Sequence, residues 1–238
     1  MKKIIITLAV LFGPLLGTSS FAMELPVPKF TAGISGHAGI LSATGKEFLR
    51  NGEGTLSAKG VKSKSRDMFI GYGTIFGEVY IDERFRIGYD YAPNDLVGDT
   101  VTGVHASKNA AQGGTGEADR TQKVQVTLTD LNTAYLAFHS PIGVFVKAGI
   151  IQAHLITNET LDSGSQYPNA DLNGYTIGAG YERPISLGDA EGIFIRGEIN
   201  QTVFERIALN ATGSENTNHI NIDDISGTNA VISIGKNF

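Results

Sequence analysis

The chain has 238 residues, a formal net charge of −5, 18% charged residues and no cysteine. An ordinary soluble domain carries about 25% charged residues, so this composition is unusually low in charge. The lack of cysteine excludes a disulfide framework, a thiolate metal site and a lipidated N-terminal cysteine. The acidic balance argues against a general nucleic-acid binder, which would carry a basic face.

The N-terminal segment has the three parts of a secretory signal. Two lysines follow the initial methionine, an apolar run covers residues 4–16, and Ser20 and Ala22 are small residues suited to a cleavage site. The alternative is a membrane-spanning helix, but such a helix needs about 20 apolar residues and this run is too short. We therefore predict a cleaved signal peptide over residues 1–22 and one mature domain over residues 23–238.

Apolar and polar residues alternate at every second position along the mature chain, as they do in strands rather than helices. In residues 84–92, Phe85 and Ile87 lie on one face. Arg86 and Asp90 lie on the opposite face. The pattern predicts eight strands, over residues 29–42, 67–80, 84–92, 122–139, 143–156, 173–183, 192–208 and 219–238.

The predicted connections alternate between short and long. The short ones follow the second, fourth and sixth strands, and the long ones cover residues 43–66, 93–121, 157–172 and 209–218. An even strand number with short turns on one side is typical of outer-membrane barrels, whose short turns face the periplasm. A change of phase near Asp130 predicts a β-bulge there.

We therefore predict an all-β fold: an eight-stranded antiparallel up-and-down transmembrane β-barrel with short periplasmic turns and long extracellular loops. A closed barrel leaves no backbone group unpaired in lipid. Aromatic residues near the strand ends predict girdles at the two membrane interfaces, formed by Phe30, Tyr80, Tyr91, Phe138, Tyr181 and Phe238. A soluble eight-stranded barrel with its apolar face inward is the structural alternative.

The chain ends on an alternating apolar strand that contains Ile232 and Ile234 and finishes at Phe238. This segment resembles the C-terminal assembly signal of the OmpA/OmpX and opacity-type group of outer-membrane barrels, although Lys236 departs from the usual aromatic or apolar residue. The resemblance implies the outer membrane of a Gram-negative bacterium. It also implies as partners the barrel assembly machinery and periplasmic chaperones during biogenesis, then outer-membrane lipids and lipopolysaccharide.

Charged residues fall on the face that a membrane barrel would turn inward. They are Arg86, Asp90, Lys147, Glu182, Arg196 and Glu198, with Glu78 as a further candidate. The interior of eight strands is just wide enough for side chains to fill, and a lone buried charge is costly. We therefore expect a plug of ion pairs, and a narrow ion or solute channel is the alternative.

Other candidate sites give weaker signals. Four cations of the first long connection, which are Lys59, Lys62, Lys64 and Arg66, could bind lipopolysaccharide phosphates or another surface anion, or could simply be solvated. Some eight-stranded barrels modify lipid A with a histidine and a serine, but His139-Ser140 falls at a periplasmic turn rather than near the outer leaflet. We expect no enzyme activity, cofactor or metal. The expected function is a structural or surface-interaction barrel, ahead of a channel and a lipid-modifying enzyme.

Overall fold

The computed structural model describes residues 29–50, 56–97, 101–107, 118–160, 166–188, 190–212 and 219–238, so the predicted signal peptide lies outside the described residues. Every described element is a strand. The strands are β1 (Phe30–Arg50), β2 (Leu56–Tyr80), β3 (Phe85–Tyr91), β4 (Leu96–Val97), β5 (Val101–Ser107), β6 (Ala118–His139), β7 (Val144–Thr160), β8 (Ala170–Pro184), β9 (Ile193–Phe204), β10 (Ile207–Asn210) and β11 (His219–Asn237). No helix in this part of the chain has the length and apolar character needed to cross a membrane.

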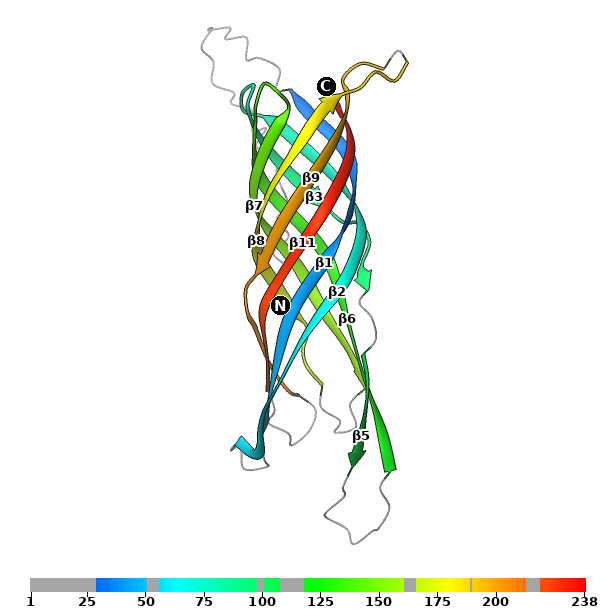
Figure 1. Ribbon diagram of the computed structural model, residues 1–238, viewed down its shortest axis with the longest axis vertical. Coiled ribbons are helices and arrows are strands. Elements are labelled where there is room, and N and C mark those ends of the chain that lie inside the picture. The colour runs from blue at the N-terminus through cyan, green and yellow to red at the C-terminus, as the bar shows by residue number, and fades with distance from the viewer. Residues whose placement is uncertain are drawn as a thin grey trace, which may run out of the picture.

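Eight of these strands form a closed ring in the order β1-β2-β3-β6-β7-β8-β9-β11, and β1 pairs with β11 to close it. Neighbours in the ring are antiparallel, and Figure 1 shows the strands tilted around a tall barrel. The short strands β4 and β5 pair with β6, and β10 pairs with β11. Closure removes the unpaired edges of an open sheet. The predicted eight-stranded up-and-down barrel is confirmed.

Three short turns, at residues 81–84, 140–143 and 185–192, join β2 to β3, β6 to β7 and β8 to β9 at one end of the barrel. We call this the short-turn end, and Figure 1 places it at the top with the C-terminus. In the first turn, Asp82 accepts hydrogen bonds from the backbone N–H groups of Phe85 and Arg84, both at 2.7 Å. These two bonds stabilise the ionised form and hold the pKa of the Asp82 carboxyl below its ordinary value.

Near the short-turn end, the barrel turns apolar side chains outward and polar side chains inward. On β11, the outward-facing Ile232 is 68% exposed, whereas its inward-facing neighbours Val231 and Ser233 are 3% and 4% exposed. Ile150 and Ile177 are likewise more than half exposed on β7 and β8. An apolar outer surface around a polar interior is the arrangement of a membrane-spanning barrel and the reverse of a soluble one.

Toward the opposite, long-loop end this arrangement inverts, and two β-bulges contribute to the change. In a regular strand, residues three positions apart face opposite sides. On β6, however, both Leu128 and Leu131 are buried inside, because Asp130 between them adopts a φ of 54° and the pairing with β7 shifts register there. The predicted bulge near Asp130 is confirmed. A second bulge at Asp224, also with a φ of 54°, has the same effect on β11.

On β7 the sequence itself makes the change without a bulge. The inward positions pass from Lys147 to the buried Ile151 and Leu155, while the outward positions pass from Ile150 to Gln152. The result is an apolar core inside the long-loop half, which we call the long-loop core. Its buried members are Ala92, Leu96, Leu128, Leu131, Ile151, Ala153, Leu155, Tyr167, Leu172, Phe204, Ile207, Leu209 and Ile225.

The strands are longer at this end than the alternation pattern predicts. Most of the predicted connection 43–66 is strand, because β1 continues to Arg50 and β2 starts at Leu56. The predicted strand 192–208 is divided into β9 and β10. β2 has 25 residues, more than twice the roughly 9–11 that cross a bilayer. Toward the long-loop end, polar residues face outward and the long-loop core lies inside. The outward apolar residues that defined the predicted strand bounds are therefore missing from this part of the strands.

Candidate functional site in the barrel lumen

Four charged side chains meet inside the short-turn half of the barrel. Glu78 and Arg86 come from the neighbouring strands β2 and β3, and Glu182 and Arg196 come from the neighbouring strands β8 and β9. Four places in the ring of eight separate β2 from β8, and four separate β3 from β9, so the two pairs of strands lie on opposite walls. Contacts among these residues therefore cross the full width of the lumen. We call the four residues the ion-pair cluster.

Glu78 is at the centre of this cluster and is 2% exposed. Arg196 donates to it through both terminal nitrogens, with Nη1–Oε1 at 2.8 Å and Nη2–Oε2 at 2.9 Å. Arg86 Nη1 donates to Oε2 at 3.1 Å, and the Tyr135 hydroxyl donates to Oε1 at 2.9 Å. The Tyr135 ring can lie there because Gly88 faces it, and a Cβ atom on Gly88 would overlap the ring. Both carboxylate oxygens of Glu78 thus have two donors each.

Glu182 completes the cluster from the opposite wall. Arg86 donates a bidentate pair of hydrogen bonds to Glu182, from Nη1 to Oε2 and from Nη2 to Oε1, both at 3.0 Å. Arg196 Nη2 donates to Oε2 at 2.6 Å. Two guanidinium groups therefore balance two carboxylates. Bidentate, charge-assisted hydrogen bonds of this kind are among the strongest polar contacts in proteins.

Aromatic rings surround Arg196 where the carboxylates do not. Its guanidinium carbon lies 5.2 Å from the ring centre of Phe76, 5.0 Å from that of Phe145 and 5.3 Å from that of Phe194. These rings exclude solvent and offer their electron-rich faces to the cation. The charge of Arg196, which is 3% exposed, is thus stabilised by protein groups on its polar and apolar sides alike.

A second layer of polar contacts involves other inward-facing charges. Lys147 of β7 forms an ion pair with Glu198 of β9. His37 Nε2 lies 3.9 Å from the Asp90 carboxylate and 3.0 Å from the Thr74 hydroxyl oxygen. These residues are all at most 8% exposed. The interior therefore continues as a packed polar layer between the ion-pair cluster and the long-loop core.

The six lumen residues predicted from the sequence all face the interior. Arg86, Glu182 and Arg196 join the ion-pair cluster, while the other three belong to the second polar layer. Glu78, only a further candidate in the sequence, proves to be the most connected of them. Sequence reasoning missed the part played by Tyr135, although its position on the inward face two residues after Thr133 was a usable signal.

A metal ion is a second arrangement to consider for these groups. One ligand atom each from Glu78, His139 and Glu182 lies within 4.8 Å of the others, the only such grouping of three found in the described part of the chain. Both carboxylates, however, already accept hydrogen bonds from Arg86 and Arg196. A divalent cation would face two guanidinium charges at this position, so the surroundings favour the ion pairs.

The other predicted residues lie apart from the lumen. Ile232 and Ile234 face outward on β11. Phe238 directly follows this strand, and its ring stacks on that of Phe30 of β1, with 4.7 Å between the ring centres, where the barrel closes. The predicted cation loop is not a loop, because its four cations lie on β2. Of these, Lys64 and Arg66 are exposed, and the side chains of Lys59 and Lys62 lie outside the described residues.

Comparison with known proteins gives structural similarity alone. No protein-family model matches the chain, and no curated protein matches its sequence. Among solved structures, OprG of Pseudomonas aeruginosa shares 10% identity with a TM-score of 0.49, covering 89% of this chain and 96% of its own. Ail of Yersinia pestis shares 10% identity with a TM-score of 0.37, covering 85% and 99%. Neisserial surface protein A shares 10% identity with a TM-score of 0.37, covering 88% and 97%.

Proposed function

We propose that this chain is an integral outer-membrane protein of a Gram-negative bacterium, with a structural or surface-interaction role and a closed lumen. The observation that carries the proposal is the ion-pair cluster. Arg196 and Arg86 each contact carboxylates from both walls, so the cluster spans the lumen. An ion or solute passing through would have to break several charge-assisted hydrogen bonds in a site that excludes water.

The long-loop core adds a second closure in series with the first. Leu128 of β6, Leu172 of β8 and Ile225 of β11 are between 2% and 4% exposed and belong to one cluster of buried residues, although β6 and β11 lie on opposite walls of the ring. An apolar constriction opposes the passage of hydrated ions even without a charged barrier. Two layers of opposite chemistry therefore close the same lumen, which favours a structural role over the channel alternative.

The length of the strands supports a role at the cell surface. β2 and β6 have 25 and 22 residues, and their outward faces become polar toward the long-loop end. With the short turns in the periplasm, as in barrels of this kind, this half stands outside the bilayer. Lys64 and Arg66 are exposed on this part of β2, and we propose that they bind a surface anion. We propose that the assembly machinery recognises the end of β11 together with Phe238, which follows it.

Planar-bilayer recording of the purified, refolded barrel tests the closed lumen. We expect no steady conductance above that of bilayers treated with heat-denatured protein, because both closures remain in place at ordinary voltages. Reproducible unitary steps that are absent from the heat-denatured control would contradict the closed lumen and establish the channel alternative.

A further inference from the structure

A groove on the outer surface of the barrel is not explained by the closed lumen. It has a volume of about 440 Å³ and lies across the three adjacent strands β11, β1 and β2. Its lining residues are Ala38, Gly39, Ile40, Ser42, Phe69, Ser226, Gly227 and Thr228. Most of these side chains are small. The groove therefore forms where small side chains on the outer surface lie between larger ones.

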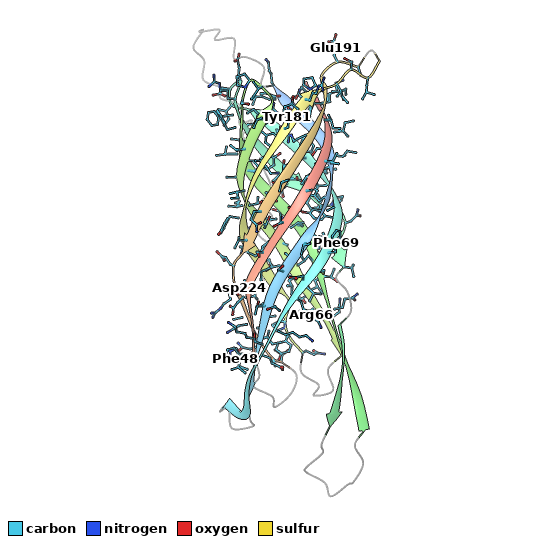
Figure 2. The ribbon with its side chains drawn as sticks, viewed as in Figure 1. Phe48, Arg66, Phe69, Tyr181, Glu191 and Asp224 are labelled. Carbon is cyan, nitrogen blue, oxygen red and sulfur yellow. The ribbon has the colours of Figure 1, made fainter. Side chains whose placement is uncertain are left out.

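Phe69 forms the tall side of the groove. Its side chain is 78% exposed, the largest exposed fraction among the large apolar residues that the structure describes. Figure 2 shows Phe69 at the edge of the barrel, between the levels of Tyr181 and Arg66. Ile40, paired with Phe69 across β1 and β2, is 48% exposed. The groove therefore has apolar walls and opens away from the lumen.

The groove lies where the apolar outer surface ends. At its long-loop edge the lining residue Ser42 donates a hydrogen bond to Asp67 at 2.6 Å, and beyond it the hydroxyl oxygens of Thr44 and Ser65 are 2.9 Å apart. On the neighbouring wall Thr228 donates to Gln201 at 2.6 Å. Toward the short-turn end, the outward residues of β1 are apolar, as at the 60% exposed Ile34. In the proposed orientation this level is the outer leaflet of the membrane.

Charge near the groove gives no reason to prefer an anionic ligand. Lys46 and Arg206 both approach the carboxylate of Asp223, at 3.2 Å and 3.5 Å, and Asp67 adds a second carboxylate. Two cations are thus balanced by two acids on this part of the outer wall. The apolar lining, which is continuous with the lipid-facing surface, is what a ligand would meet.

We infer that this groove binds one acyl chain of an outer-leaflet lipid, and that it binds the chain more tightly than the rest of the lipid-facing surface does. The inference rests on the proposed membrane location. Apolar surface gains little hydrophobic free energy from a lipid chain, because lipid is already apolar. A chain lying in a groove nevertheless contacts atoms on two sides, and each additional carbon contact adds a small dispersion attraction. The expected preference is therefore modest and specific to this wall.

The absence of tryptophan from the sequence makes a clean experiment available. A Phe69→Trp variant places a single fluorophore on the groove wall, and Ile150→Trp is the matched control. Ile150 is 63% exposed and is the last apolar outward residue before Gln152, on β7, which lies opposite β1 in the ring. Both variants are refolded into phosphatidylcholine vesicles that contain increasing fractions of phosphatidylcholine with dibrominated acyl chains.

We expect half-maximal quenching of the Phe69→Trp barrel at a brominated fraction about two- to fourfold lower than for the Ile150→Trp barrel, which corresponds to a few extra carbon contacts. The Ala38→Leu substitution places a larger side chain in the groove. When it is added to Phe69→Trp, we expect the quenching curve of the double variant to coincide with that of the Ile150→Trp barrel.

Coincident curves for the two single-tryptophan barrels would overturn the groove as a lipid site. Weaker quenching of the Phe69→Trp barrel than of the Ile150→Trp barrel would also overturn it and indicate a second copy covering this wall. If the fluorescence of neither barrel is quenched, the proposed membrane location itself fails, and the inference fails with it.

Discussion

Replacing Glu78 by glutamine is expected to lower the free energy of unfolding by about 3–5 kcal/mol, the usual cost of breaking a buried ion pair by removing one partner. Glutamine preserves the volume of the side chain, so packing is retained and the loss is one of charge. Arg86 and Arg196, which are 6% and 3% exposed, would be left with only Glu182 between them. One buried guanidinium charge would then have no counter-charge.

Unfolding by urea in lipid vesicles, followed by far-UV circular dichroism, measures this loss. Glu191→Gln is the control, because Glu191 is exposed at the short-turn end, near the end of the barrel in Figure 2, and its change should stay within about 0.5 kcal/mol. Adding Arg86→Gln to Glu78→Gln restores the balance of one cation to one anion, so it should recover part of the stability. A Glu78→Gln barrel as stable as the Glu191→Gln barrel would show that the cluster does not hold the walls together.

Replacing Leu172 by alanine is expected to cost about 2–5 kcal/mol, the range for deleting a buried leucine side chain from a packed core. Leu172 of β8 is 2% exposed and belongs to the long-loop core, where its neighbours come from other strands. The loss combines the removed apolar contacts with the cavity that remains. This expectation depends on the long-loop core being packed rather than filled with water.

Leu187→Ala provides the same chemical change at a different place. Leu187 lies in the turn between β8 and β9 and is 53% exposed, so its replacement should change the free energy of unfolding by no more than about 0.5 kcal/mol. The same urea titration compares the two variants. Equal, small losses for both leucines would mean that the long-loop half of the lumen is hydrated, and the second closure would have to be abandoned.

The sequence predicts the short-turn half of the fold well because one simple pattern controls it. Wherever the outer surface must be apolar and the interior polar, strict alternation follows, and segments such as 84–92 and the end of β11 carry it clearly. Arg86 and Asp90 could thus be assigned to the lumen from their positions alone. The closing contact of Phe238 with Phe30 follows from the same ring of strands.

The long-loop core could not be predicted from that pattern, because in this half of the barrel the apolar side chains face inward rather than outward. Toward the long-loop end apolar residues face inward, and bulges at Asp130 and Asp224 change which positions do so. A prediction that keeps the same inward and outward positions along a whole strand therefore ends the strands too early. It assigns residues 43–66 to a loop, although most of them are strand. Gln152 on the outward face of β7 was a local signal of the change.

The pairing of charges in the lumen also lay beyond the sequence. Alternation shows that Glu78 and Arg196 face inward, and the predicted ring order shows which walls they come from. Neither shows that the two side chains lie at the same level along the barrel. That relation follows from the ring order and the stagger of the strands, which are set by closure as a whole. The sequence therefore offers Glu78 only as a further lumen candidate, although in the structure it contacts both Arg86 and Arg196.

The central claim is that this chain forms a closed barrel inserted in the outer membrane. It is tested most directly by expressing the full-length chain in a Gram-negative host, separating the membranes, and comparing unheated with boiled samples on the same gel. We predict that the protein is found in the outer-membrane fraction and that unheated protein migrates as a compact band distinct from the boiled form. Protein recovered in the soluble fraction, with identical migration before and after boiling, would contradict the claim.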